Sequence, residues 1–176
     1  MDLTKIKLPD TITVSGVDYP IQTGHTYWFR FSQLLDDINS TFGDFDFLYI
    51  DEKPENRQEG FTELFNFYYE KKEIPRVTDE SSGVKAIDYT VDADLLYAGL
   101  LQQYGVDLSL KNIHWHKVRA MIAGLKETKL NDIIYYRTCD YDAKQKELMK
   151  AKTAWALPEK EDNASKELEE FNALFD

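Results

Sequence analysis

Two histidines and a large number of carboxylates are the residues of this chain that could do chemistry. His114 and His116 stand two residues apart in a stretch with helical periodicity. On a helix their side chains would point about 200° apart and could not hold one metal ion together. We expect one ring to be half-buried and the other exposed. The carboxylates cluster in predicted loops and in the C-terminal tail, not opposite one another across a predicted cleft as acid–base catalysis requires.

Motifs of known catalytic or cofactor sites do not occur in the sequence. There is no G-x-x-x-x-G-K-[ST], G-x-G-x-x-G, G-x-S-x-G or H-E-x-x-H pattern. Asp44, Asp46, Asp51 and Glu52 suggest calcium, but they lack the spacing, the glycine and the final glutamate of an EF-hand. We expect a solvated acidic loop between residues 36 and 60, and no catalytic residue, metal site or cofactor. A small metal-dependent enzyme that uses this loop is the remotest alternative.

Composition narrows the function further. The chain has 176 residues, a formal net charge of −11 and a single cysteine, Cys139. One cysteine excludes a disulfide framework and a cysteine-based zinc site, and it fits a reducing compartment. An acidic surface repels nucleic acid. Since no apolar run approaches the roughly 20 residues of a membrane span, we expect a soluble intracellular protein with no nucleic acid and no membrane partner.

The densest apolar periodicity, from Thr90 to Arg137, predicts three consecutive helices that form the core. The first carries two parallel apolar rows and should be buried on more than one side; Thr90 or Asp92 can cap it and Gly105 can end it. The second is predicted from about Ser109 to Gly124. The third runs from about 128 to 137, with Arg137 over its C-terminus, where a cation is favoured.

Other elements surround this trio. Residues 11–22 alternate around a Ser15-Gly16 turn and predict a β-hairpin. Helices are predicted at 25–38 with Thr23 as cap, at 58–73 and at 143–157, and a flexible loop at 75–88. The fold class is therefore mainly α, a helical domain with a short N-terminal β-hairpin. We predict a single domain over 1–157 and a flexible acidic tail over 158–176.

Aromatic residues make up 14% of the chain, enough to serve a core, an interface or both. We assign the neighbourhood of Trp115 and Tyr136 to the core. The candidate partner-binding residues are Tyr68, Tyr69, Trp155, Phe171 and Phe175.

The 90–137 stretch also resembles the bacteriophage gp-fifteen family of small acidic proteins, which are encoded in the tail modules of long-tailed phages and prophages of Gram-positive bacteria. The residues that carry the resemblance are Asp94, Tyr97, Leu100, Leu101, the run from Gln103 to Leu108, Ile113, His114, Trp115, Lys117, Arg119, Ala120, Gly124, Leu125, Ile134, Tyr136 and Arg137. Weaker agreement reaches Tyr19-Pro20-Ile21, Trp28, Phe31, Leu34-Leu35-Asp36-Asp37 and Ala156-Leu157-Pro158.

The resemblance implies a non-catalytic tail assembly protein. Genes of this family are commonly found beside the tape-measure gene, where tail assembly chaperones are encoded. The resemblance therefore implies the phage tape-measure protein and the tail-tube protein as partners, in the host bacterial cytoplasm. The alternative is a structural component of the tail or head-to-tail joint that stays in the virion. Whether the chain forms a homo-oligomer stays open.

Overall fold

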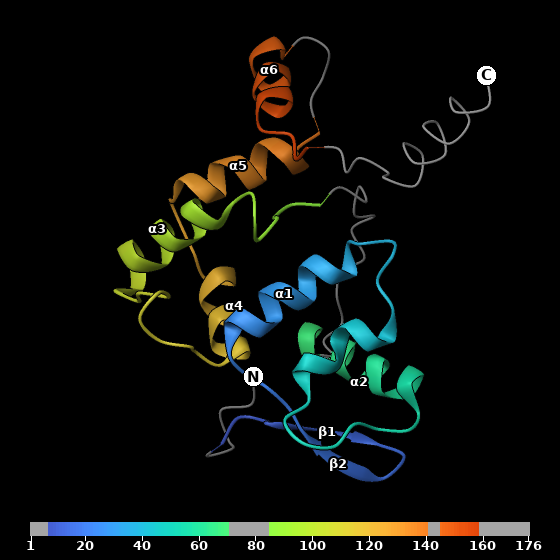
Figure 1. The fold of residues 1–176 in the computed structure, drawn as a ribbon. Coiled ribbons are helices and arrows are strands. Elements are labelled where there is room, and N and C mark those ends of the chain that lie inside the picture. The colour runs from blue at the N-terminus through green and yellow to red at the C-terminus, as the bar shows by residue number, and fades with distance from the viewer. Residues whose placement is uncertain (1–6, 71–84, 141–144, 159–176) are drawn as a thin grey trace, which may run out of the picture. The chain divides into compact units, whose positions relative to one another are not determined.

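The computed structural model describes residues 7–70, 85–140 and 145–158, and its helices outweigh its strands (Figure 1). In chain order the elements are β1 (Thr11–Val14), β2 (Val17–Pro20), α1 (His25–Leu35), the 3₁₀ helix η1 (Phe42–Leu48), α2 (Arg57–Tyr69), α3 (Ala93–Tyr104), α4 (Trp115–Ala123), α5 (Lys129–Thr138) and α6 (Lys146–Ala154). The prediction of a mainly α fold with an N-terminal hairpin is confirmed.

The chain divides into two compact units between Cys139 and Asp140. The first unit holds every element from β1 to α5, and α6 belongs to the second. The predicted separation of a 158–176 tail from a 1–157 domain stays a prediction, because residues 159–176 lie outside the described residues. The same holds for most of the predicted loop at 75–88, of which only 85–88 are described.

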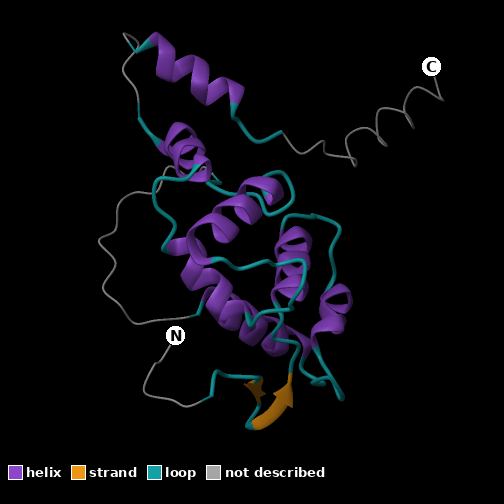
Figure 2. Cartoon of the chain, turned by 90° about the vertical axis from the view of Figure 1, so that its left-hand side faces the viewer, coloured by secondary structure: helices purple, strands orange, loops and turns teal. Residues whose placement is uncertain are grey.

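The hairpin forms as its alternation predicts (Figure 2). β1 and β2 pair antiparallel, with Val14 opposite Val17. Ser15 and Gly16 both have positive φ, as the tight turn that matches strand twist requires. Ile12 and Val14 are buried, and the Ser15 amide and hydroxyl donate to the Glu59 carboxylate on α2. A two-stranded sheet is marginal alone, so these contacts with α2 hold it.

The first hydrophobic cluster is aromatic and joins the hairpin, α1, η1 and α2 to the start of α4. Its buried members are Ile12, Val14, Ile21, Trp28, Phe31, Phe45, Leu48, Tyr49, Leu64, Phe67, Tyr68 and Trp115. Trp28 stacks on Phe67 with ring centroids 4.7 Å apart, and Trp115 stacks on Tyr68 at 5.1 Å. Both indole N–H groups donate to backbone carbonyls, so neither ring leaves a buried donor unsatisfied.

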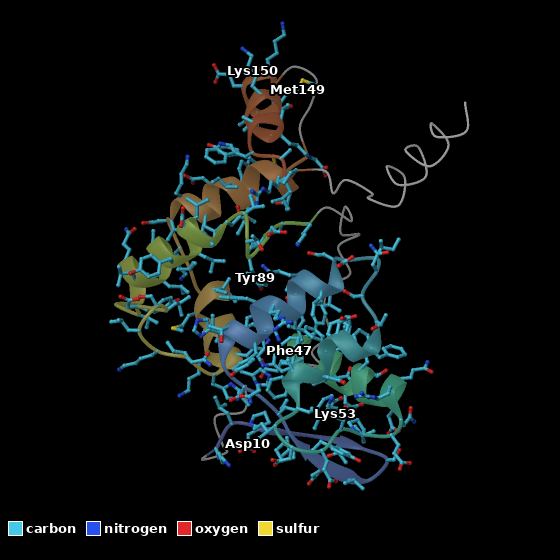
Figure 3. The ribbon with its side chains drawn as sticks, in the orientation of Figure 1. Asp10, Phe47, Lys53, Tyr89, Met149 and Lys150 are labelled. Atoms are coloured by element: carbon cyan, nitrogen blue, oxygen red, sulfur yellow. The ribbon has the colours of Figure 1, made fainter. Side chains whose placement is uncertain are left out.

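The second cluster is aliphatic and lies among α3, α4 and α5. Its buried members are Leu96, Leu100, Val118, Leu125 and Leu130. Phe29 and Tyr89 pack against both clusters, with ring centroids 4.8 Å apart; Tyr89 is labelled in Figure 3. These two rings and Trp115, 5.8 Å from Phe29, form the seam between the clusters.

Several helix ends were predicted correctly because their signals are local. Gly105 ends α3 with φ of 63°, in the left-handed region that glycine adopts at least cost. α5 also begins where it was predicted to, directly after Thr128; the capping box between Thr128 and Asn131 was not predicted.

Other helix ends differ from the prediction. α1 is preceded by Gly24, not capped by Thr23, whose carbonyl instead accepts from the Trp115 amide. α1 also stops at Leu35, which leaves Ile38 exposed. α4 begins at Trp115 and not near Ser109, because His114 forms the cap.

Asp92 and Arg137 make a contact that was not predicted. Asp92 stands at the N-cap of α3, but its side chain makes no cap bond; Arg137 lies in the last turn of α5, as predicted, but it is buried. Instead the Arg137 guanidinium donates to both carboxylate oxygens of Asp92, at 2.6 and 2.9 Å, with Asp92 1% and Arg137 4% exposed. Arg137 also donates to the Ala86 carbonyl, and Asp92 accepts from the Asp88 amide. This buried pair ties the start of α3 to the end of α5.

Burial of α3 on more than one side is also wrong. Leu96 and Leu100 are buried, but Tyr104, which continues their row, and the parallel row of Tyr97 and Leu101 are exposed. We call Tyr97, Leu101 and Tyr104 the α3 face.

Candidate protein-binding surface

A cavity of about 410 Å³ opens where the end of α1, the start of η1 and the start of α2 meet. Its lining is mostly apolar: Leu34, Leu35, Asp37, Ser40, Thr41, Phe42, Phe45 and Phe61. Phe45 is buried, whereas Phe42 stays 47% exposed at the rim. Concave apolar sites with a few polar groups are where proteins hold ligands and partner side chains.

A row of rings continues from this cavity along α2. Phe61, Phe65 and Tyr69 are spaced four residues apart, and four residues are close to one helical turn, so they share one side. Ring centroids are 5.5 Å apart from Phe42 to Phe61, 6.4 Å from Phe61 to Phe65 and 4.6 Å from Phe65 to Tyr69. Phe65 is 40% and Tyr69 46% exposed. We call Phe42, Phe61, Phe65 and Tyr69 the aromatic row.

The acidic stretch before α2 positions the row and is not the solvated loop that its composition predicts. Phe45 and Leu48 of η1 are buried in the first cluster. The Asp44 carboxylate accepts from the amide and the hydroxyl of Thr41, which fixes the start of η1 beside Phe42. These hydrogen bonds lower the pKa of Asp44.

A second carboxylate fastens η1 to α2. Asp46 accepts from Arg57, the first residue of α2, and from Lys53, which is labelled in Figure 3. The bonds from Arg57 and Lys53 hold the pKa of Asp46 below its ordinary value. Asn56 caps α2 by accepting from the Glu59 amide. Asp44 and Asp46 thus serve the placement of Phe42 and Phe45.

Charge at the cavity is negative. Asp37 is the only charged residue among the described residues that line it, and none of those residues is basic. One Asp37 oxygen accepts from the Asn39 amide at 3.0 Å. The neighbouring Asp36 pairs with Lys85, which also binds Asp88. The rim therefore presents one exposed carboxylate beside the aromatic row.

The residues predicted to bind a partner differ in their exposure. Tyr69 is exposed in the aromatic row, but Tyr68 is only 7% exposed, because its side of α2 faces Trp28 and Trp115. Burial raises the pKa of Tyr68. The prediction that Tyr68 contacts a partner is therefore wrong, because its side chain is buried. Trp155 follows α6 in the second unit and is partly exposed, whereas Phe171 and Phe175 lie outside the described residues.

Phe42 and the cavity were missed, although the sequence holds a signal for them. Phenylalanines stand at 42, 45 and 47 in the stretch interpreted as a solvated loop, and three large apolar side chains do not suit that environment. The Arg30 guanidinium carbon lies over the Phe47 ring, 4.4 Å from the ring centroid. Phe47 is labelled in Figure 3.

The two histidines lie closer together than predicted. His114 precedes α4, so the helical angle does not apply, and the two ring centroids are 5.1 Å apart. His116 is 3% exposed, which makes the expectation of an exposed ring wrong. Each Nε2 donates to a carbonyl, of Pro9 from His114 and of Phe67 from His116, and His114 Nδ1 accepts from the His116 amide.

Through these contacts both rings hold the fold together. Burial lowers the pKa of His116 to about 4, and its Nδ1 has no hydrogen-bond partner. Burial also lowers the pKa of His114. In the described parts of the chain, no group of three or more His, Cys, Asp or Glu side chains is arranged to hold a metal ion.

Comparison with known proteins gives one match. Residues 5–157 match the family model described as Bacteriophage Gp15 protein, which covers most of the chain and confirms the resemblance. Searches of curated proteins and of solved structures gave no match. Within the described ranges, every helix is too short or too polar to cross a membrane.

Proposed function

Since the chain belongs to the Bacteriophage Gp15 protein family, we propose that it is a non-catalytic tail assembly chaperone that binds the tape-measure protein and tail-tube subunits in the host cytoplasm. The family itself indicates a structural or tail-associated phage protein. The chaperone role, its partners and the absence of catalysis are the proposed steps.

The aromatic row beside its cavity is the observation that carries the proposal. Contiguous exposed apolar surface on a soluble domain marks interaction sites, and aromatic residues are enriched in the cores of interfaces. Phe42, Phe65 and Tyr69 are each at least 40% exposed, and Phe61 connects Phe42 to Phe65. A protein that keeps an aggregation-prone partner soluble needs such a surface together with a strong net charge, here −11.

The carboxylates support a binding role over a catalytic one. Asp44 and Asp46 hold η1, Glu59 holds the hairpin turn, and Asp92 pairs with Arg137. A general acid or base must meet a substrate proton, whereas these groups are engaged with the protein itself.

Co-expression with the cognate tape-measure protein tests the proposal. We expect the wild-type chain to raise the soluble fraction of the tape-measure protein and to copurify with it. Phe65→Ala combined with Tyr69→Ala should weaken both effects, and Leu101→Ala on the α3 face is the matched control. Absence of rescue and of copurification would contradict the proposal.

Mass spectrometry of purified virions tests the alternative. A chaperone leaves before the particle is complete, so we expect no peptides of this chain in mature virions. Stoichiometric amounts there would instead identify a structural component of the tail or the head-to-tail joint.

A further inference from the structure

We propose that the cavity and the aromatic row bind an amphipathic helix of a protein partner, with large apolar side chains on one side and lysine or arginine beside them. This inference rests on the proposed function and names the partner chemistry of the same surface.

The length of the row suits a helix. Phe61 and Tyr69 are eight residues apart on α2, which is about 12 Å at the rise of an α-helix. Phe42 extends the row at its Phe61 end, with the ring centroids 5.5 Å apart. Roughly two to three turns of a partner helix would cover this distance, with apolar side chains at i, i+4 and i+7.

The cavity gives one of those side chains a place to insert. Leu34 and Leu35 of α1 and Phe45 of η1 form apolar walls, and Phe42 and Phe61 connect them to the row. A large aliphatic or aromatic anchor in such a pocket is the usual centre of a helix-in-groove interface.

Charge selects the occupant. Asp37 is exposed on the cavity lining, where no described lining residue is basic, so a cation on the partner helix would pair with it. Two other occupants carry the wrong charge. A second copy of this chain brings a net charge of −11, and residues 159–176 hold an excess of acidic side chains around Leu168, Phe171, Leu174 and Phe175. Like charges disfavour both at this acidic rim.

Fluorescence anisotropy with the full chain and designed peptides tests the inference. The probe is a labelled peptide of roughly 18 residues, long enough to fold on binding, with Leu and Phe at i, i+4 and i+7 and Lys at flanking positions. Matched peptides carry Glu or Gln in place of Lys, and a scrambled peptide has the same composition without the spacing. We expect the Lys peptide to bind best and the Glu and scrambled peptides at least about tenfold more weakly.

Variants locate the binding. Phe65→Ala with Tyr69→Ala should weaken the Lys peptide by about tenfold or more. Asp37→Asn should weaken the Lys peptide a few-fold and leave the Gln peptide unchanged, since only the charge pair is removed. Leu101→Ala should change nothing. All three variants alter exposed side chains, and a cooperative thermal transition checks that they fold.

Four results would overturn the inference. Equal binding of the Lys and Glu peptides removes the charge argument, and an equal loss in Leu101→Ala removes the location. If Phe171→Ala combined with Phe175→Ala made the full chain bind the peptide more tightly, the cavity and the aromatic row (together, the groove) would belong to the chain's own C-terminal segment. Self-association abolished by Phe65→Ala would assign it to a second copy.

The outcomes also separate this inference from the proposed function. If the peptides fail but the tape-measure protein copurifies, the chaperone proposal stands and the groove is not its binding site. If the peptides bind but the tape-measure protein does not, the groove stands with another helical partner.

Discussion

The two hydrophobic clusters of the first unit close in different ways. The aliphatic cluster lies among α3, α4 and α5, and the buried ion pair of Asp92 and Arg137 joins the start of α3 to the end of α5. The aromatic cluster around α1, η1 and α2 runs from buried Trp28 and Phe31 outward, through half-buried Phe61, to exposed rings beside a cavity.

Because of this difference, we assign stability mainly to one region and binding to the other. A buried ion pair stabilises a fold only while both partners are present, because either charge alone is very costly to bury. Rings that stay 40–47% exposed stabilise less than buried rings, since a large part of their surface still meets water. We therefore expect substitutions in the aliphatic half to change the free energy of unfolding, and those in the aromatic row to change binding.

The largest expected effect follows removal of Arg137. Arg137→Ala leaves the Asp92 carboxylate buried without its cation, so we expect the free energy of unfolding to fall by about 3–5 kcal/mol in urea titrations. The matched control is Lys53→Ala, which removes a more exposed partner of Asp46 in the aromatic half and should cost at most about 1 kcal/mol. Equal losses for the two variants would contradict the comparison.

Asp92 and Arg137 also show where prediction from sequence ends. The Ser15-Gly16 turn, the end of α3 at Gly105 and the start of α5 near Thr128 were predicted because each signal acts within a few residues. Asp92 and Arg137 are 45 residues apart, and nothing near either one indicates its partner. Their types were noticed and given local roles, as cap and as dipole partner, that the tertiary fold overrides.

The candidate surface shows the same limit at shorter range. Tyr68 and Tyr69 are neighbours in one periodic helix, and periodicity alone does not say which side meets α1 and α4. The cavity is built from three segments, so its shape follows from tertiary packing and could not be read from any of them.

The second expected effect is a loss of stability in mild acid through the histidines. His116 has a native pKa of about 4 against an ordinary value of 6.5, because burial disfavours its charged form. Between these values the unfolded chain binds a proton that the native chain does not, so stability falls as pH falls through this window. Burial lowers the pKa of His114 and His25 too, which adds in the same direction.

Urea titrations at pH 7.5 and 5.5 measure this effect. We expect a loss on the order of 1 kcal/mol from His116 alone over that interval. His116→Gln should flatten the pH dependence while lowering stability at pH 7.5. A wild-type stability that is constant from pH 7.5 to 5.5 would contradict this prediction. It would show that the neutral rings of His114 and His116 do not tie α4 to the N-terminal segment and to α2.

The smallest expected effect on stability, and the sharpest test of the comparison, is at Phe65. Phe65 is 40% exposed while its neighbour Leu64 is 1% exposed, so the two side chains share a helix but not an environment. Leu64→Ala should cost about 2–5 kcal/mol because it leaves a cavity in the aromatic cluster. Phe65→Ala should stay within about 1 kcal/mol of wild type, since alanine's higher helix propensity offsets part of the lost ring contact with Tyr69. A loss at Phe65 as large as that at Leu64 would mean that the aromatic row is part of the core, and exposure would then no longer argue for a partner.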